Sequence, residues 1–182
     1  MHKKNLYRCD EKKVSSDYFN GNVTIKEVYN ENNSQDQELY FVEFSNGALT
    51  TMHYHETEQF LIPVYGKGII GELKKNSILN FDLDDVEINF LDVGEIVSIP
   101  PNILHFHGAL PHQTFTHVAF RKLFDYECTN GEKNPYRTQT RWVSDFIAGE
   151  LGSEDSDLKK TSLQNISNKV NQSVNKALTS ID

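Results

Sequence analysis

Short β-prone runs, separated by roughly ten residues, fill the chain from residue 38 to residue 123. The most strongly β-prone run is ELYFVEF at residues 38–44, and the last is TFTHVAFRKL at residues 114–123. Gly, Pro and Asn punctuate the intervals, and no helical periodicity interrupts them. Aromatic and β-branched residues favour strands, and strands at this spacing are typical of β-sandwiches and barrels. We therefore predict an all-β domain over this part of the chain.

The length of 182 residues and the apolar content of 37% suit one barrel-sized domain with appendages. We expect an N-terminal arm at residues 1–21, a β-barrel at 22–124, and a loop with a short helix packing on the barrel at 125–152. Residues 153–182 are polar, but apolar residues recur in them at three- and four-residue steps. This tail is predicted to be either disordered or an amphipathic helix.

Charge and hydropathy limit the classes of partner. The formal net charge is -8 and no dense Lys/Arg stripe is present, which argues against a nucleic-acid partner because phosphates require a basic surface. No apolar run approaches the roughly 20 residues that span a bilayer, and no secretion signal follows the charged N-terminus. We expect a cytoplasmic protein without a membrane partner.

Six of the seven histidines lie in two clusters between residues 47 and 117. Side chains alternate between the faces of a strand, so His53 and His55 share one face, and His105 and His107 share a face of a later strand. Two pairs of imidazoles on different walls of a barrel are the arrangement that a metal site needs. One histidine alone on an apolar strand is more often a core residue, so the hypothesis depends on the whole pattern.

The residues of the first cluster resemble the first motif of the cupin superfamily, G-x5-H-x-H-x3,4-E-x6-G. Gly47, His53, His55, Gln59 and Gly66 occupy its positions, with glutamine in place of the glutamate. The resemblance implies a cupin double-stranded β-helix, which is a jelly-roll barrel, and a short C-terminal helical extension follows it.

The second cluster resembles the second cupin motif through Gly94, Pro100 and His105. The segment IPPNILHFHGA is similar to that of small cupins described alongside carboxymuconolactone decarboxylases. Asn102 stands where that motif has glycine, a substitution that asparagine tolerates because it enters the left-handed region more readily than other residues.

The resemblance implies that His53, His55, Gln59 and His105 bind a metal ion, with Glu58 as the rival for the fourth position. These donors suit a divalent transition metal ion (Zn, Mn, Fe, Ni or Cu) without selecting one. Glutamine adds no negative charge, so the ion would retain its full +2 charge and favour an anionic ligand.

Further polar residues are expected around this site. His107 and His117 would lie close to the metal and are candidate catalytic acids or bases. Three residues are candidates for substrate binding: Tyr65 by its strand parity, Arg121 because it shares a face with His117, and His112 from the intervening loop.

Together these features predict a metal-dependent enzyme acting on a small, oxygen-rich, anionic compound. Isomerase, lyase or lactone-type chemistry and dioxygenase chemistry both fit a cupin metal site. The alternative is a non-catalytic cupin that binds or senses a small molecule. We also expect a homodimer formed through N-terminal strands or a sheet edge.

Overall fold

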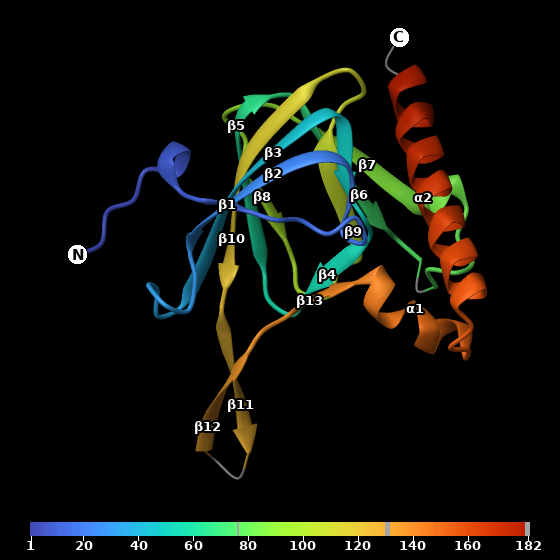
Figure 1. Cartoon of the computed structure of the whole chain (residues 1–182). Coiled ribbons are helices and arrows are strands. Elements are labelled where there is room, and N and C mark those ends of the chain that lie inside the picture. The colour runs from blue at the N-terminus through green and yellow to red at the C-terminus, as the bar shows by residue number, and fades with distance from the viewer. Residues whose placement is uncertain (76, 130–131, 181–182) are drawn as a thin grey trace.

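A curled antiparallel sheet of eleven strands forms the body of the molecule (Figure 1). The structure is a computed structural model that describes residues 1–75, 77–129 and 132–180. The strands of the large sheet are β1 (Glu11–Lys12), β2 (Phe19–Tyr29), β3 (Gln37–Thr50), β4 (His53–His55), β5 (Gln59–Gly66), β6 (Gly68–Leu73), β7 (Val86–Leu91), β8 (Val97–Ile99), β9 (His105–Ala109), β10 (Thr114–Lys122) and β13 (Thr140–Trp142).

Strand β3 is the longest strand and pairs with β2, β9 and β10. The main path through the sheet runs β13-β4-β9-β3-β10-β5-β8, with β6 and β7 joined to it through β9. Short 3-10 helices occur at η1 (Leu6–Arg8) and η2 (Leu83–Asp85), and η2 is the only helix among the described residues between 38 and 123. The all-β prediction for this region is confirmed.

Alternation along β9 directs neighbouring side chains to opposite faces of the sheet. His105 and His107 face one side, whereas Phe106, which is fully buried, belongs to the hydrophobic cluster on the other side. At Gly108 the strand passes so close to β3 that a Cβ atom would lie 2.2 Å from the carbonyl oxygen of Ala48. Glycine is therefore required where these two strands meet.

Two helices cover the face of the sheet on which Phe106 lies (Figure 1). The short helix expected within residues 125–152 is α1 (Val143–Leu151). The tail forms the amphipathic helix α2 (Ser156–Thr179) and not a disordered segment. The side chain of Asp155 caps α2 by accepting from the backbone N–H groups of Asp157 and Leu158. No described helix is long and apolar enough to cross a membrane.

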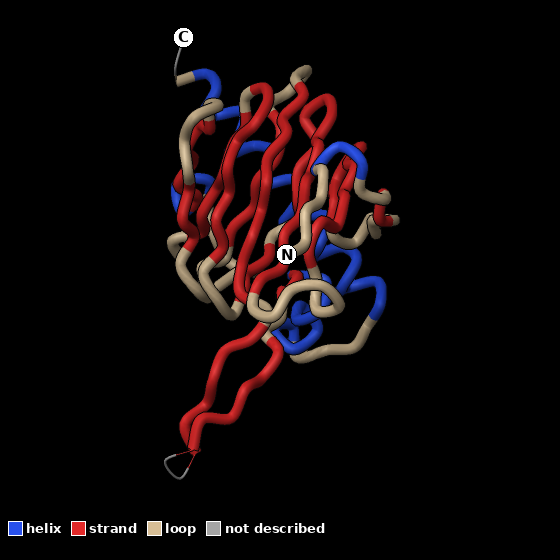
Figure 2. Tube along the Cα trace, turned by 90° about the vertical axis from the view of Figure 1, so that its left-hand side faces the viewer, coloured by secondary structure: helices blue, strands red, loops and turns tan. Residues whose placement is uncertain are grey.

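A two-stranded hairpin replaces the loop predicted after residue 124. Its strands β11 (Phe124–Thr129) and β12 (Glu132–Arg137) pair with each other and project away from the large sheet (Figure 2). The charged and polar residues of this segment suggested a loop, but exposed strands also carry such residues. At the other end of the chain, β1 lies within the predicted arm and pairs with β2. The four segment boundaries stay a prediction.

Candidate metal centre

A cavity of about 590 Å³ lies against the histidine face of the sheet. Its walls come from β2, β3, β4, β5, β9, β10 and β13, together with the N-terminal segment before β2 and the segment that leads into β13. Among the lining residues are His53, His55, Gln59, His107, His117 and Arg121. The two histidine clusters of the sequence therefore meet at one cavity.

Pairing between β4 and β9 places three imidazoles together. His53 and His105 are direct cross-strand partners, and their ring centres lie 4.3 Å apart. Ligand nitrogens of His53, His105 and His107 all lie within 4.8 Å of one another. Nitrogen ligands of one zinc ion lie roughly 3.3 Å apart, given Zn–N bonds near 2.05 Å and tetrahedral angles. Small side-chain rotations would bring these three atoms to that separation.

Backbone carbonyls determine which nitrogen of two of these rings is free. The Nδ1 atom of His53 lies 2.9 Å from the carbonyl oxygen of Thr51, and that of His105 lies 2.8 Å from the carbonyl oxygen of Ile103. A carbonyl oxygen only accepts hydrogen bonds, so each Nδ1 carries the proton and donates. Each Nε2 keeps its lone pair, which is the tautomer of a histidine that ligates a metal.

Several buried polar atoms near this cluster have no hydrogen-bond partner among the described residues. They include His55 Nε2, Gln59 Oε1, His105 Nε2 and His107 Nδ1. Unpaired buried polar atoms are uncommon, and each costs about 1–3 kcal/mol. A group of nitrogen and oxygen atoms that lack partners fits a bound cation, so the residues present suit a divalent transition metal.

Burial keeps the site histidines neutral. It lowers the pKa of His105 to about 4 and that of His117 to about 3. Burial also lowers the pKa values of His53, His55 and His107 well below the usual range, and the charges of neighbouring histidines lower them further. Neutral imidazoles bind metal ions without first losing a proton, so the cluster is ready for a metal at neutral pH.

The cavity lining is basic although the chain has a net charge of -8. Lys12, Lys13, Arg121 and Arg137 line it, and Glu38 is the one carboxylate among the described lining residues. Three of these cations are paired with carboxylates: Lys12 with Glu27, Arg137 with Glu31 and Arg121 with Glu38. Lys13 has no carboxylate partner among the described residues and adds positive charge at the cavity, which favours anions.

Comparison with solved structures gives the family. A cupin-like protein from Thermotoga maritima is 30% identical in sequence to this chain, with a TM-score of 0.54. The match covers 79% of this chain and 94% of that protein. The chain belongs to the cupin superfamily. The curled β half-barrel with a C-terminal helix pair therefore confirms the predicted fold class.

Two further structures share the fold of this cupin. The polyketide cyclase RemF from Streptomyces resistomycificus is 17% identical, has a TM-score of 0.55, and is matched over 79% of this chain and 85% of that protein. Oxalate decarboxylase from Lactobacillus farciminis is 16% identical with a TM-score of 0.55, and the match covers 84% of this chain but 41% of that protein. No protein-family model and no curated protein sequence matches the cupin.

The turn before β9 has the conformation that the second motif requires. Asn102 adopts a φ of 63°, the left-handed conformation expected at the glycine position. Its backbone N–H donates to the carbonyl oxygen of His55 at 2.8 Å. This bond joins the start of β9 to β4 and helps to hold the two histidine strands together.

Three of the four predicted ligands, His53, His55 and Gln59, line the cavity, and His105 lies next to His53 as its cross-strand partner. His53 and His105 belong to the close triad, and the third member is His107, which was predicted as a catalytic residue. The ring of His55 lies beside them, 5.0 Å from His53 and 5.5 Å from His105 between centres. Gln59 lines the cavity. The full ligand set stays a prediction.

Glu58, the rival of Gln59, lies immediately before β5 and points away from the cavity. Its side chain is exposed and accepts a hydrogen bond from the hydroxyl group of Ser98. Successive side chains on a strand point to opposite faces, so Gln59 and not Glu58 lies in the cavity.

His117 lies deep in the same cavity between two aromatic rings. Its ring stacks on Phe44 and Phe115, with centres 5.6 and 5.4 Å away, and it is 5.0 Å from the ring of His107. Both of its nitrogens are buried without a hydrogen-bond partner among the described residues. His117 therefore presents one donor and one acceptor to a cavity ligand.

Two predicted substrate-binding residues lie outside the cavity lining. Tyr65 is 64% exposed because β5 contains a bulge. Pro63 and Tyr65 pair with the successive β10 residues His117 and Thr116, so the alternation of faces along β5 is inverted after Pro63. His112 is exposed in the turn between β9 and β10, where it adopts a φ of 61°. Neither residue is in the cavity lining, contrary to the inward orientation expected of Tyr65. Their roles in substrate binding stay predictions.

Arg121, by contrast, is buried in the cavity wall. Its Nε atom donates to Glu38 Oε1 at 2.5 Å, and both side chains are less than 10% exposed. Glu38 was not recognised as a site residue from the sequence. Arg121 and Glu38 are cross-strand partners between β10 and β3, a register that short β-prone runs do not reveal.

Proposed function

We propose that this cupin is a metal-dependent enzyme that acts on a small, oxygen-rich, anionic compound. The observation that supports this function most is a buried group of histidine and glutamine atoms at the cavity for which the described residues offer no hydrogen-bond partner. Enzymes such as the cyclase RemF and oxalate decarboxylase have the same fold. Since one fold hosts many chemistries, they support the proposal only in general terms.

In this proposal His53 and His105 bind the metal together with at least one of His55 and His107, and Gln59 supplies an oxygen ligand. Nitrogen donors suit Zn, Fe, Ni and Cu, whereas Mn prefers oxygen. A divalent ion bound there would act as a Lewis acid toward an oxygen atom of the substrate.

Arg121 would bind the anionic group of the substrate. It lies directly across from Gln59 in the pairing of β10 with β5, so a carboxylate on its guanidinium would lie beside the metal ligands. Glu38 holds the guanidinium in the cavity wall through their buried ion pair. The exposed Lys13 adds positive charge at the cavity and would attract the anion, whereas Lys12 pairs with Glu27.

His117 would hold and move a proton at the inner end of the cavity. A neutral imidazole donates from one nitrogen and accepts at the other, so it can bind a hydroxyl or carbonyl group of the substrate. When the substrate oxygen or adjacent carbon becomes acidic, the accepting nitrogen can take its proton. Isomerase, lyase or lactone-type chemistry would use such a group.

Dioxygenase chemistry is the second candidate, because histidine donors also suit ferrous iron, nickel and copper. A non-catalytic binding protein would use the same metal and cavity without proton transfer. These possibilities predict different results in two experiments. If the enzyme transfers protons, His117→Gln loses turnover. If it is a dioxygenase, it consumes oxygen with catechols or diketones.

Metal analysis tests the proposed function. We expect the purified protein, or the protein reconstituted with Zn²⁺, Fe²⁺, Ni²⁺ or Cu²⁺, to hold one ion per chain. The His117→Gln variant should retain the ion and lose turnover of lactone or enolisable substrates. Failure of the reconstituted protein to take up any of these ions would overturn the proposal.

A further inference from the structure

Three alternate residues of the segment that follows the hairpin line the cavity with buried or half-buried side chains: Thr138, Thr140 and Trp142. The intervening Gln139, which also borders the cavity, and Arg141 are exposed. This alternation is expected of an extended segment with one face toward the protein. The three inward side chains therefore form a continuous wall of the cavity.

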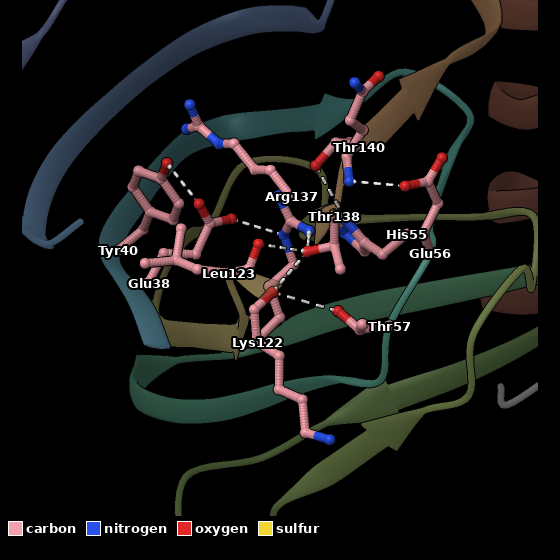
Figure 3. Close-up of polar contacts among 12 residues, drawn as sticks. Glu38, Tyr40, His55, Glu56, Thr57, Lys122, Leu123, Arg137, Thr138 and Thr140 are labelled. Atoms are coloured by element: carbon pink, nitrogen blue, oxygen red, sulfur yellow. Dashed lines mark hydrogen bonds and ion pairs between the residues drawn. The ribbon is translucent and has the colours of Figure 1, made fainter. Parts of the chain in front are cut away.

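Thr140 and Trp142 each contact a different histidine of the site. The Thr140 hydroxyl lies 2.9 Å from His55 Nδ1 (Figure 3), and the Trp142 ring stacks on the His53 ring with centres 4.4 Å apart. The hydroxyl can accept from Nδ1–H, and in that tautomer His55 keeps the lone pair on Nε2, a buried atom with no partner among the described residues. Trp142 restricts the orientation of the His53 ring by stacking on its face.

Thr138 contacts the arginine of the site. Arg121 Nη1 donates to its hydroxyl oxygen at 3.0 Å, and that hydroxyl lies 2.7 Å from the carbonyl oxygen of Lys122 and 3.1 Å from that of Leu123 (Figure 3). The hydroxyl hydrogen is thus directed to the backbone, and its lone pair to the guanidinium. Thr138 therefore binds Nη1 of the Arg121 guanidinium, whereas Glu38 binds its Nε.

The outward face attaches this wall to the rest of the barrel. The Glu56 carboxylate accepts from the backbone N–H of Gln139 at 2.9 Å and from Arg141 Nε at 3.2 Å. The backbone N–H of Glu56 donates back to the Gln139 carbonyl oxygen at 3.2 Å. Strand pairing of β13 with β4 sets Thr140 and Trp142 directly across from His55 and His53. The wall is therefore held in one register.

Trp142 is also covered on its second face. Tyr18, from the N-terminal segment, stacks on it with ring centres 4.6 Å apart and an angle of 17° between the rings. Tyr18, Trp142 and His53 thus form a stack that ends at a predicted metal ligand. Stacked rings resist rotation, so the stack restricts the orientation of the His53 imidazole.

We propose that Thr140 and Trp142 are positioning residues that orient His55 and His53 toward the metal, and that Thr138 orients Arg121 toward the substrate anion. The inference rests on the proposed function. Partners that orient ligands in this way typically change metal affinity by about 10- to 100-fold when they are removed. The wall therefore sets how tightly the cavity holds its ion.

Titration with Co²⁺ tests the contact to His55. Thr140→Val keeps the shape of threonine but removes the hydroxyl group. We expect Co²⁺ affinity to fall about 10-fold and the visible absorption spectrum of the bound Co²⁺ to change, because the ligand field depends on ring orientation. Thr140→Ser restores the hydroxyl group and should restore both the affinity and the spectrum.

Trp142 supplies a second readout because it is the only tryptophan of the chain. Co²⁺ bound by His53 would quench its fluorescence, and the quenching should follow the same binding curve as the absorption change. In Trp142→Leu, which removes the stacked face, Co²⁺ affinity should fall by a similar factor. Unchanged fluorescence of the wild-type protein on saturation with Co²⁺ would contradict the stacking of Trp142 on a ligand.

Thr57→Val is the matched control. Thr57 is buried and its hydroxyl donates to the carbonyl oxygen of Lys122 at 3.3 Å (Figure 3). Among the described residues its side chain forms no hydrogen bond with a site histidine or with Arg121. Its Co²⁺ affinity should equal that of the wild-type protein, and its metal-free melting temperature should fall as much as that of Thr140→Val. Equal Co²⁺ affinities in Thr140→Val, Trp142→Leu and wild type would overturn the inference.

The outcome for the wild-type protein separates this inference from the proposed function. If the wild type binds no Co²⁺ at all, the proposed function is wrong, and the effect of the wall on metal binding does not arise. If the wild type binds Co²⁺ and the wall variants bind it equally well, only the inference fails.

For Thr138→Val we expect unchanged Co²⁺ affinity and several-fold weaker binding of acetate to the Co²⁺ form. Unchanged acetate binding would overturn its role.

Discussion

At the scale of single residues, the neutrality of the buried histidines is the main determinant of how the site responds to pH. Burial lowers the pKa values of His105 and His117 to about 4 and about 3, and those of His53, His55 and His107 well below the usual range. In the unfolded chain each imidazole would titrate near pH ~6.5. Between these values the unfolded chain binds more protons than the folded protein.

We therefore predict that the metal-free protein loses stability as the pH falls. Stability rises with pH wherever the unfolded state holds more protons, so the loss begins near pH ~6.5 and continues toward pH ~3. Urea denaturation of the metal-free protein between pH 8 and pH 5 would measure it. Maximum stability at pH 5 would contradict the neutral, buried state of these rings.

His117 gives a second prediction, because it lies between two phenylalanine rings and its nitrogens have no hydrogen-bond partner in the part of the chain that the structure describes. His117→Phe removes two buried polar atoms and retains an aromatic ring, so the free energy of unfolding of the metal-free protein should rise by about 1 kcal/mol. His117→Ala should lower it, because the smaller side chain leaves a cavity. A fall in stability for His117→Phe, measured in urea, would mean that the imidazole has a structural partner.

The motif residues were the most predictable part of the site, because their spacing along single strands determines which side chains share a face. His53 with His55 and His105 with His107 needed only the period of two. Tyr65 was mispredicted because a bulge after Pro63 inverts the parity, and no residue in that run signals it. Residues brought in from a distant strand, such as Trp142, need a register that the sequence alone does not contain.

At the scale of elements, helix α2 stabilises the fold without contributing to the site. Its buried residues belong to the same hydrophobic cluster as Phe106, on the face of β9 opposite to His105 and His107. The apolar residues at three- and four-residue steps predicted this amphipathic helix as one of two alternatives. Packing against the sheet decides between them, because Asn- and Ser-rich helices are weak on their own.

Ile166→Ala tests this division of roles. Ile166 is 5% exposed in α2, and its truncation should lower the free energy of unfolding by about 2–5 kcal/mol. Co²⁺ affinity of the folded variant should stay at the wild-type value, because the helix lies on the opposite face of the sheet. Weaker Co²⁺ binding by the folded Ile166→Ala protein would show that α2 supports the metal site.

The hairpin of β11 and β12 was not predicted, because only one of its strands carries a strand pattern. Strand β11 (FDYECT) alternates apolar and polar residues, whereas β12 (EKNPYR) does not and contains Pro135. The two strands pair with each other and project from the large sheet. The segment that returns from the hairpin nevertheless supplies Thr138, Thr140 and Trp142 to the cavity.

At the scale of the whole molecule, the ends of the curled sheet are where a second copy would pair. Strand β8 ends one side of the sheet path, and β1 lies outermost beyond β2. Unpaired strand edges favour association. We predict a homodimer, which light scattering at micromolar concentration would detect, and a monomer at that concentration would contradict the prediction.

Anomalous X-ray diffraction from crystals loaded with one transition metal tests the central claim most directly. We predict a single strong peak at the cavity, within bonding distance of the Nε2 atoms of His53 and His105. The peak should disappear in crystals of the double variant His53→Ala with His105→Ala. His2→Ala, which changes a histidine remote from the cavity, should leave the peak in place. A peak elsewhere on the molecule, or one that survives loss of both His53 and His105, would contradict the account.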